Sequence, residues 1–270
     1  NLAAPKLYTA RVALVADSGL RDESDLNFGI RNMQFRADTG FWLNGKNIKL
    51  KGVAIHADGG AFGMAVPLDV YERRLSILKS LGVNAIRTAH HPFSPEFLDL
   101  CDRMGFVVMD EAFDMWHEQK TPNDYHTSFD EWHEKDLRAQ IRRDRNHPSV
   151  IAWSTGNEIP EQGKPEGWKL AAHLAEIARG EDRTRPVTSA YNHTDSGYNG
   201  FQNVVDIFGY NYKPGEYGKM HASAPYLPIY GSETASTVSS RGEYFFPVSD
   251  DKSKGAANFQ VSSYDLTDRK

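Results

Sequence analysis

Two glutamates stand at the same kind of place in the sequence, each shortly after an apolar run. The first run covers residues 149–153 and leads through Gly156 and Asn157 to Glu158. The second covers residues 228–231 and leads to Glu233. A single glutamate after a strand is commonly a solvated loop residue, so neither position is persuasive alone. The similar placement of both indicates that they belong to one site.

A pair of carboxylates on separate strands meets the minimal requirement of glycoside cleavage. One carboxylic acid protonates the departing oxygen, and the other carboxylate attacks or stabilises the anomeric carbon. Carboxyl groups about 5–5.5 Å apart lead to retention of configuration through a covalent intermediate, and roughly 6.5–9.5 Å apart to inversion. The sequence identifies the pair and leaves that distance open.

The elements that position these residues alternate between strand and helix patterns. The predicted strands cover residues 50–56, 83–87, 106–110, 149–153, 186–190, 206–210 and 228–231. The predicted helices begin after Pro67 and at Ser94-Pro95, and two more lie around residues 137–141 and 170–177. Strands that alternate with helices form right-handed βαβ units and a parallel sheet. We therefore predict an α/β fold.

An open doubly wound sheet and a closed (β/α)8 barrel both fit this alternation. No glycine-rich phosphate-binding fingerprint follows the first strand, which weakens the dinucleotide-binding alternative. Polar or aromatic residues stand at the end of almost every strand: His56, Arg87, Asp110 and Glu111, Asn157 and Glu158, Tyr212, and Glu233. In a barrel all of these ends converge on one mouth, whereas an open sheet concentrates its site at one crevice. The distribution favours a (β/α)8 TIM barrel, in which strands four and seven lie across from each other.

The two ends of the chain differ from this middle part. Residues 7–15, 27–31 and 33–36 alternate like antiparallel strands, and we predict that residues 1–40 are the last strands of an upstream all-β, immunoglobulin-like sandwich domain. The barrel then occupies residues 41–270. The 37 residues after Glu233 (270 − 233) are largely polar and contain no convincing eighth strand and helix. We therefore expect the chain to stop before the barrel closes.

The composition of the chain argues against some classes of function and leaves the cellular compartment open. The net charge is 31 − 36 = −5 without a block of like charge, which argues against a nucleic-acid partner. No apolar run approaches the roughly 18 residues of a membrane span. The single cysteine, Cys101, cannot form an internal disulfide and is expected to be a buried apolar side chain. The start lacks the features of a signal peptide, so the compartment, whether cytoplasmic or periplasmic and secreted, stays open.

Five segments together resemble glycoside hydrolase family 2, which contains β-galactosidases, β-glucuronidases and β-mannosidases. They are Phe41–His56, Ala85–Pro92, Leu100–Ala112, Asp144–Glu158 and Gly231–Glu233. The similarity extends over residues 28–243, and the combination of motifs is specific to the family. It implies a (β/α)8 barrel preceded by two β-sandwich domains, and hydrolysis of a terminal β-linked sugar with retention.

The resemblance also implies roles for individual residues. Glu158 resembles the general acid/base and Glu233 the nucleophile. Asn157 resembles the amide that binds the sugar 2-hydroxyl, and Arg87 the arginine that keeps the nucleophile ionised. Tyr212 resembles the tyrosine that donates a hydrogen bond to the nucleophile, and a shift in the alignment of this strand would give that role to Tyr210.

Four further residues are expected to contact the sugar. His56 and His90 resemble sugar-binding histidines of the galactosidases, with a structural hydrogen-bonding role as the alternative. Asp114 is expected to accept from a sugar hydroxyl and Trp116 to stack on a sugar face, with a turn aspartate and a packed aromatic as alternatives. Some relatives bind magnesium in this loop, but Met115 stands where the carboxylate ligand would be, so we predict no metal site.

We expect a glycoside or oligosaccharide substrate and no cofactor. We expect no nucleic-acid or membrane partner. A homo-oligomer is an open alternative to a monomer. Among the sugars we favour a β-galactoside, with β-glucuronide and β-mannoside as alternatives. An endo-acting glycanase on the same barrel and an inactive, truncated carbohydrate-binding fragment are the remaining alternatives.

Overall fold

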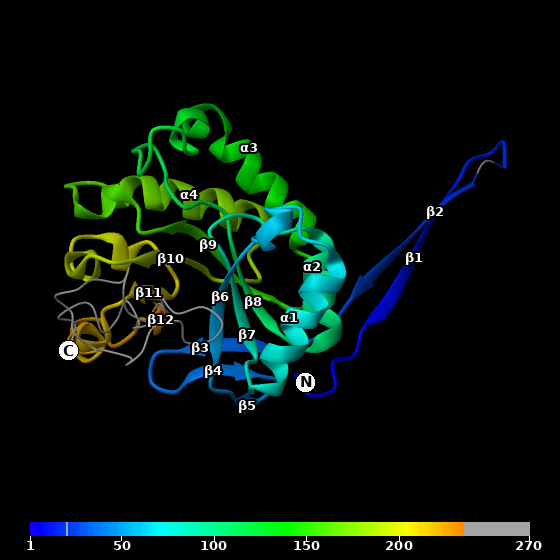
Figure 1. Cartoon of the computed structure of the whole chain (residues 1–270), viewed down its shortest axis with the longest axis horizontal. Coiled ribbons are helices and arrows are strands. Elements are labelled where there is room, and N and C mark those ends of the chain that lie inside the picture. The colour runs from blue at the N-terminus through cyan, green and yellow to red at the C-terminus, as the bar shows by residue number, and fades with distance from the viewer. Residues whose placement is uncertain (20, 235–270) are drawn as a thin grey trace.

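The computed structural model describes residues 1–19 and 21–234, which form a curled parallel sheet with helices on its outer side (Figure 1). Seven strands follow one another in chain order across this sheet. They are β6 (Gly52–His56), β7 (Ala85–Ala89), β8 (Val107–Glu111), β9 (Val150–Asn157), β10 (Val187–Tyr191), β11 (Phe208–Asn211) and β12 (Ile229–Glu233). All neighbouring pairs are parallel. The predicted TIM-barrel arrangement is confirmed for these seven strands.

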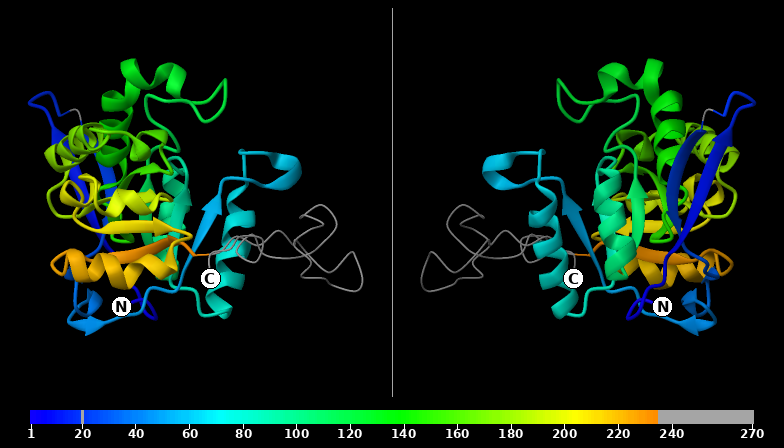
Figure 2. Two further views of the ribbon diagram at one scale, coloured as in Figure 1. Left: turned by 90° about the vertical axis from the view of Figure 1, so that its left-hand side faces the viewer. Right: turned by 90° about the vertical axis from the view of Figure 1, so that its right-hand side faces the viewer.

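The connections between the strands contain the helices, which cover the outer face of the sheet (Figure 2). They are α1 (Leu68–Ser80), α2 (Pro95–Met104), α3 (His126–Asp144), α4 (Trp168–Glu181) and the short α5 (Tyr217–Ser223). Five 3₁₀ turns add to them: η1 (Gly60–Phe62), η2 (Pro160–Gly163), η3 (Thr194–Gly197), η4 (Phe201–Asn203) and η5 (Pro214–Glu216). The connection from β10 to β11 thus consists of two 3₁₀ turns in place of an α-helix.

Helix α2 illustrates how the sequence sets these boundaries. The Ser94 hydroxyl accepts from the backbone N–H of Phe97 at the helix start, and Pro95 occupies the first helical position. The helix ends at Gly105, whose φ of 75° lies in the left-handed region that glycine adopts readily. A Cβ at Gly105 would lie 2.1 Å from the carbonyl oxygen of Leu2. Glycine is therefore required here by both conformation and space.

Burial along the strands reflects their place in the sheet. Every residue of β7, β8, β9, β10 and β11 is buried, as expected for strands covered on both faces. The outer strands β6 and β12 are partly exposed. They approach one another without backbone pairing among the described residues. The expectation that no eighth strand follows falls on residues 235–270, which lie outside the described residues.

The N-terminal residues form two antiparallel units. Strands β3 (Met33–Arg36), β4 (Gly40–Leu43) and β5 (Lys46–Asn47) form a small sheet. Phe41 and Leu43 of this sheet pack against strand residues of the barrel such as Ile151. The boundary predicted at residue 40 falls inside this sheet, whose side chains Met33 and Phe35 also pack against the same cluster. The division of the chain into a sandwich domain and a barrel stays a prediction.

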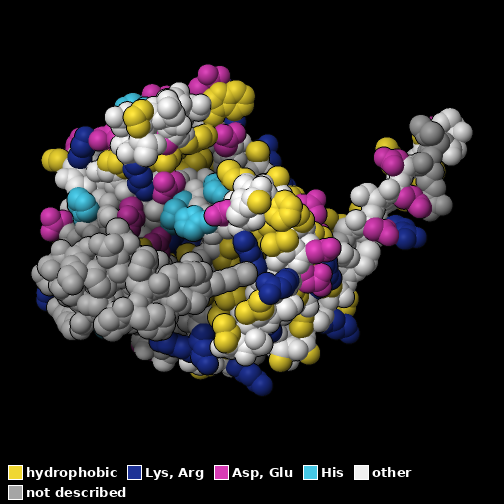
Figure 3. All heavy atoms as spheres, in the orientation of Figure 1, with side chains coloured by type: hydrophobic (Ala, Val, Ile, Leu, Met, Phe, Trp, Pro, Cys, Tyr) yellow, Lys and Arg dark blue, Asp and Glu magenta, His cyan; other side chains and the backbone are white. Residues whose placement is uncertain are grey.

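Strands β1 (Tyr8–Val15) and β2 (Arg21–Phe28) form a hairpin that stands clear of the body (Figure 3). The strand predicted at residues 7–15 is confirmed, and the one predicted at 27–31 is wrong, because β2 begins at Arg21 and ends at Phe28. Its first residues, Arg21–Asp25, are mostly charged and carry no apolar alternation. Membership of this hairpin in an immunoglobulin-like domain stays a prediction. No described helix is both long and apolar enough to cross a membrane.

Candidate active site

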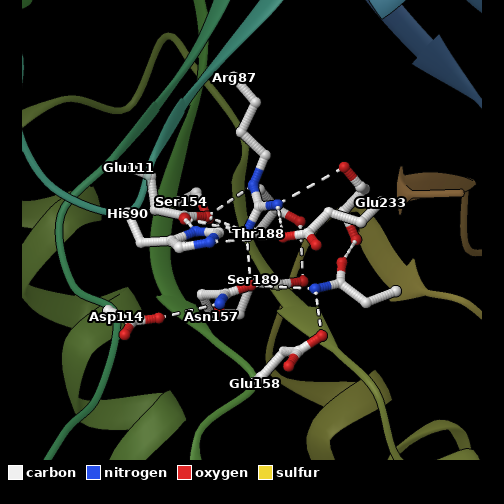
Figure 4. A network of polar contacts seen from close by, with 12 residues as sticks. Arg87, His90, Glu111, Asp114, Ser154, Asn157, Glu158, Thr188, Ser189 and Glu233 are labelled. Carbon is white, nitrogen blue, oxygen red and sulfur yellow. Dashed lines mark hydrogen bonds and ion pairs between the residues drawn. The ribbon is translucent and has the colours of Figure 1, made fainter. Parts of the chain in front are cut away.

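Several of the polar side chains predicted from the strand ends, among them Arg87, Glu111 and Glu233, meet at the carboxyl end of the sheet (Figure 4). Arg87 lies on β7, Glu111 ends β8, Asn157 ends β9, and Glu233 ends β12. Glu158 follows Asn157 directly. Because all strands of the sheet are parallel, these ends lie on one side of it, which is where barrel enzymes form their sites.

Arg87 is the centre of this network. Its Nε and Nη2 donate to the two oxygens of Glu111 over 2.8 and 2.9 Å. Its Nη1 donates to Glu233 Oε1 over 2.8 Å, and its Nη2 also donates to Asn157 Oδ1 over 2.8 Å. Burial alone would lower the pKa of Arg87, but Glu111, Tyr230 and Glu233 outweigh it and raise the pKa. One buried guanidinium therefore links β7 to the ends of β8, β9 and β12.

Glu233 is held as a carboxylate. Its side chain is 15% exposed, and the hydroxyl of Tyr212 donates to its Oε2. His90 Nε2 lies 3.5 Å from its Oε1. Burial would raise the pKa of Glu233, but the charge of Arg87 and the hydrogen bonds from Tyr212 and Arg87 outweigh it and lower the pKa. Glu233 is consequently ionised at neutral pH.

Glu158 is joined to the rest of the site by Asn211, which is fully buried at the end of β11. Asn211 Nδ2 donates to Glu158 Oε1 over 2.9 Å and to Asn157 Oδ1 over 3.0 Å. The Ser232 hydroxyl donates to Asn211 Oδ1 over 2.6 Å, which orients the amide. Glu158 itself has a φ of 43°, in the left-handed region that non-glycine residues seldom adopt. The side chains of Glu158, just after β9, and Glu233, at the end of β12, are thus connected through hydrogen-bonded side chains.

The two histidines lie beside Glu233, on β6 and just after β7. His90 Nδ1 lies 2.7 Å from Glu111 Oε1, and the His90 ring meets the His56 ring edge-on, with centroids 5.1 Å apart. Burial and the neighbouring His90 lower the pKa of His56, so this imidazole is neutral at neutral pH. His56 is exposed, whereas His90 is engaged with Glu111.

Asp114 lies on the other side of Asn157. Its Oδ1 accepts from Asn157 Nδ2 over 2.9 Å and from Lys120 Nζ over 2.7 Å. Burial would raise the pKa of Asp114, but these two donors outweigh it and lower the pKa. Asp114 is therefore an ionised carboxylate that orients the side-chain amide of Asn157.

Trp116 does not have the exposed position that a sugar platform requires. Its side chain is 0% exposed, and its indole N–H donates to the backbone oxygen of Thr155 over 2.7 Å. A ring that is buried on both faces offers no surface to a sugar, so the expectation that Trp116 contacts the substrate is wrong. The packing depends on Gly156, because a Cβ there would lie 2.8 Å from the indole nitrogen.

Met115 and His117, on either side of Trp116, pack or hydrogen-bond within the protein. Met115 is buried, and His117 Nδ1 lies 2.8 Å from Asp130 Oδ1 at the surface. These two positions do not bring together the oxygen ligands that a hard divalent cation prefers.

The roles of Glu111 and Asn211 are not apparent from the sequence. In the sequence Glu111 is only a polar strand end, yet it is the fully buried partner of Arg87 and also accepts from the Ser154 hydroxyl over 2.6 Å. Asn211 is a polar residue at the end of a predicted strand, directly before Tyr212. The criterion that selected the other strand-end residues could therefore also have selected Asn211. Its bonds to β9 and β12 follow from strand register, which the sequence does not display.

The comparisons with known proteins agree on one family. A sequence profile of the glycosyl hydrolases family 2 TIM barrel domain matches residues 36–225. Beta-galactosidase BoGH2A of Bacteroides ovatus is 40% identical over 97% of this chain and 35% of its own length. A putative beta-glucuronidase of Formosa agariphila is 37% identical over 89% of this chain and 22% of its own length.

A solved glycosyl hydrolase family 2 member from Bacteroides cellulosilyticus superposes with a TM-score of 0.79 and 41% identity, covering 84% of this chain and 29% of that one. The chain thus spans about a third or less of the length of the curated relatives named here. The profile, the curated relatives and the solved structure agree on the domain to which the parallel sheet belongs. The chain therefore belongs to glycosyl hydrolase family 2 and carries seven strands of that family's TIM barrel.

Proposed function

We propose that this barrel is the catalytic domain of a retaining β-glycosidase, with Glu158 as general acid/base and Glu233 as nucleophile. The observation that carries the proposal is the state of Glu233. Its carboxylate is held ionised by Arg87 and Tyr212, and it faces a second carboxyl group across Asn211. A carboxylate and a second carboxyl group at one site are what glycoside cleavage requires, and membership of family 2 supports the retaining outcome.

The proposal is tested by trapping the covalent intermediate. A 2-deoxy-2-fluoro β-glycoside with a good leaving group forms a glycosyl-enzyme that is hydrolysed slowly, and mass spectrometry of peptides then locates the label. We expect the label on Glu233. A label on another residue would overturn the assignment of the nucleophile, and no label with any sugar would overturn the proposed activity.

Replacing Glu158 by Ala is expected to affect substrates unequally. Without the acid, kcat/KM should fall roughly 10²–10⁴-fold for glycosides with alkyl or sugar leaving groups. Dinitrophenyl glycosides leave without protonation, so their first step should stay close to the wild-type rate. Steady-state kinetics on both substrate types make the comparison. An equal loss for both types would instead indicate a structural role for Glu158.

The pH dependence of activity follows from the lowered pKa of Glu233. The ionised carboxylate is the reactive form, so kcat/KM should persist below the usual glutamate value of 4.5 before it declines. In Tyr212→Phe the carboxylate loses a donor, its pKa rises, and the acid limb should move to higher pH. Tyr210→Phe is the matched control, because the Tyr210 hydroxyl donates to the backbone of Thr194. An acid limb that moves equally in both variants would contradict this role of Tyr212.

For the sugar, we propose a neutral β-galactoside. Among the described residues, the hydrogen-bonded network contains the carboxyl groups of Glu111, Asp114, Glu158 and Glu233 and the cations of Arg87 and Lys120. The guanidinium of Arg87 is committed to Glu111, Glu233 and Asn157 within the network. This charge balance is unfavourable for a uronic acid, and the galactosidase relative at 40% identity supports the same choice.

A panel of nitrophenyl β-glycosides tests the sugar. We expect the highest kcat/KM with the β-galactoside. Faster turnover of the β-glucuronide or the β-mannoside would assign that specificity instead, and activity confined to internal bonds of polysaccharides would indicate an endo-acting enzyme. A homo-oligomer and the absence of a nucleic-acid partner stay predictions.

A further inference from the structure

The loop between β8 and α3 brings a lysine against the backbone that precedes the proposed acid. Lys120 Nζ donates to the carbonyl oxygen of Asn157 over 2.8 Å and to Asp114 Oδ1 over 2.7 Å. Asp114 Oδ1 in turn accepts from the side-chain amide of Asn157. Lys120, Asp114 and Asn157 therefore form a closed ring of hydrogen bonds. The Lys120 side chain is 24% exposed, and most of its length is covered.

The peptide unit between Asn157 and Glu158 is held on both sides. Its carbonyl accepts from Lys120, and its N–H donates to the backbone oxygen of Ala190 over 2.8 Å. This matters because Glu158 has the left-handed φ of 43°. A non-glycine residue keeps such a conformation only where its surroundings fix it, and Lys120 is the side chain that fixes the carbonyl.

The loop is itself ordered around Lys120. The backbone N–H groups of Lys120 and Thr121 donate to Asp124 Oδ2 over 2.8 and 2.7 Å. This turn fixes the point from which the lysine side chain extends, so the contact with Asn157 is built into the loop. Within the described part of the chain, the Lys120 ammonium binds Asn157 and Asp114 and neither proposed catalytic carboxylate. Its direct contacts with the site are therefore with the Asn157 backbone and Asp114.

We propose that Lys120 is a positioning residue for Glu158, which holds the peptide unit of Asn157 and Glu158 so that the Glu158 carboxyl group faces the leaving-group oxygen. The inference rests on the proposed function, because it requires Glu158 to act as an acid. Lys120 transfers no proton in this scheme. It fixes the orientation on which proton transfer from Glu158 depends, and small misplacements of a catalytic group are costly in rate.

The test is a comparison of leaving groups in Lys120→Met. For alkyl or disaccharide substrates, kcat/KM should fall about 10–100-fold, mainly in kcat, because protonation of the leaving group is impaired. For a dinitrophenyl glycoside, kcat/KM should fall less than about 3-fold, and labelling of Glu233 by the fluoro-sugar should continue at the wild-type rate. Lys120→Arg keeps the charge and the donors and should recover most of the activity on alkyl glycosides.

Lys164→Met is the matched control. Lys164 binds Glu118, which belongs to the same loop as Lys120. Among the described residues, the Lys164 ammonium makes no hydrogen bond to Asn157. The substitution should leave both substrate classes unchanged. Melting temperatures of all three variants identify any that fail to fold, and Lys120→Arg keeps the test informative if Lys120→Met is unstable.

The outcomes separate the inference from the proposed function. Equal losses on activated and alkyl glycosides, or no loss on either, would overturn the positioning role while wild-type turnover and the Glu233 label stand. A wild-type protein that neither turns over nor labels with any sugar would overturn the proposed function and the role of Lys120 with it. Selective loss on alkyl glycosides, with recovery in Lys120→Arg, is the result we expect.

Discussion

Replacing Glu233 by Gln is expected to lower the turnover of β-glycosides by roughly 10⁴-fold or more. The carboxamide has nearly the same shape and can still accept from Arg87, but it cannot form the glycosyl ester. The fold should survive, because the substitution removes no buried volume. The measurement is kcat on a dinitrophenyl glycoside, where the need for an acid is smallest and the loss therefore reports on the nucleophile.

Two further variants make this result specific. Glu134→Gln changes a carboxylate on the outer surface of α3, paired with Arg138, and should leave turnover unchanged. In Glu233→Ala, azide can attack the anomeric carbon from the vacated side, and the product should be an α-glycosyl azide. Residual turnover of Glu233→Gln within 100-fold of the wild type would remove Glu233 from the role of nucleophile, since the loss of a covalent nucleophile costs far more than about that factor.

Replacing Arg87 by Met is expected to damage both stability and activity. The change leaves Glu111, fully buried, and the partly buried Glu233 without their cation. Breaking a buried ion pair from one side costs about 3–5 kcal/mol, so the free energy of unfolding in urea should fall by that order. Because the pKa of Glu233 is lowered by Arg87, that pKa should rise in the variant, and the acid limb of kcat/KM should move to higher pH.

A surface arginine provides the comparison. Arg142 binds Glu181 with two hydrogen bonds, but its side chain is largely exposed. Glu181 keeps its ion pair with Arg138 when Arg142 is removed. Because an ion pair to a largely exposed arginine contributes about 0–1 kcal/mol, Arg142→Met should be nearly neutral for unfolding and for activity. If Arg87→Met unfolded at the same urea concentration as the wild type, the network around Arg87 would not be a stabilising element of the sheet.

The order of strands and helices can be predicted from the sequence because each signal is local. Apolar runs, the Ser94-Pro95 helix start and Gly105 each act within a few residues. The convergence of strand ends then follows from parallel topology, so the sequence alone is sufficient to group Arg87, Asn157 and Glu233 at one site. In the parallel sheet, the observed strand limits differ from the predicted ones by only a few residues, as at β9, which extends to Asn157.

The residues whose roles the sequence does not reveal depend on contacts between distant segments. Trp116 has the residue type of a sugar platform, but Gly156 on the neighbouring strand leaves space that the indole fills. Asn211 contacts Glu158 and Asn157 because of the register between β9, β10 and β11. Lys120 reaches Asn157 across a loop. No local pattern encodes these pairings, so only the three-dimensional arrangement reveals them.

The guanidinium of Arg87 also has a consequence for the reaction cycle itself. Strands β6 and β12 have no backbone pairing with each other among the described residues, and the Arg87–Glu233 ion pair connects β12 to β7 across that gap. Forming a glycosyl ester on Glu233 would turn a carboxylate into a neutral group and end that ion pair, while Glu111 keeps its hold on Arg87. With the proposed function, each turnover would thus release and restore an electrostatic connection between β12, at one edge of the sheet, and β7, which neighbours the strand at the other edge.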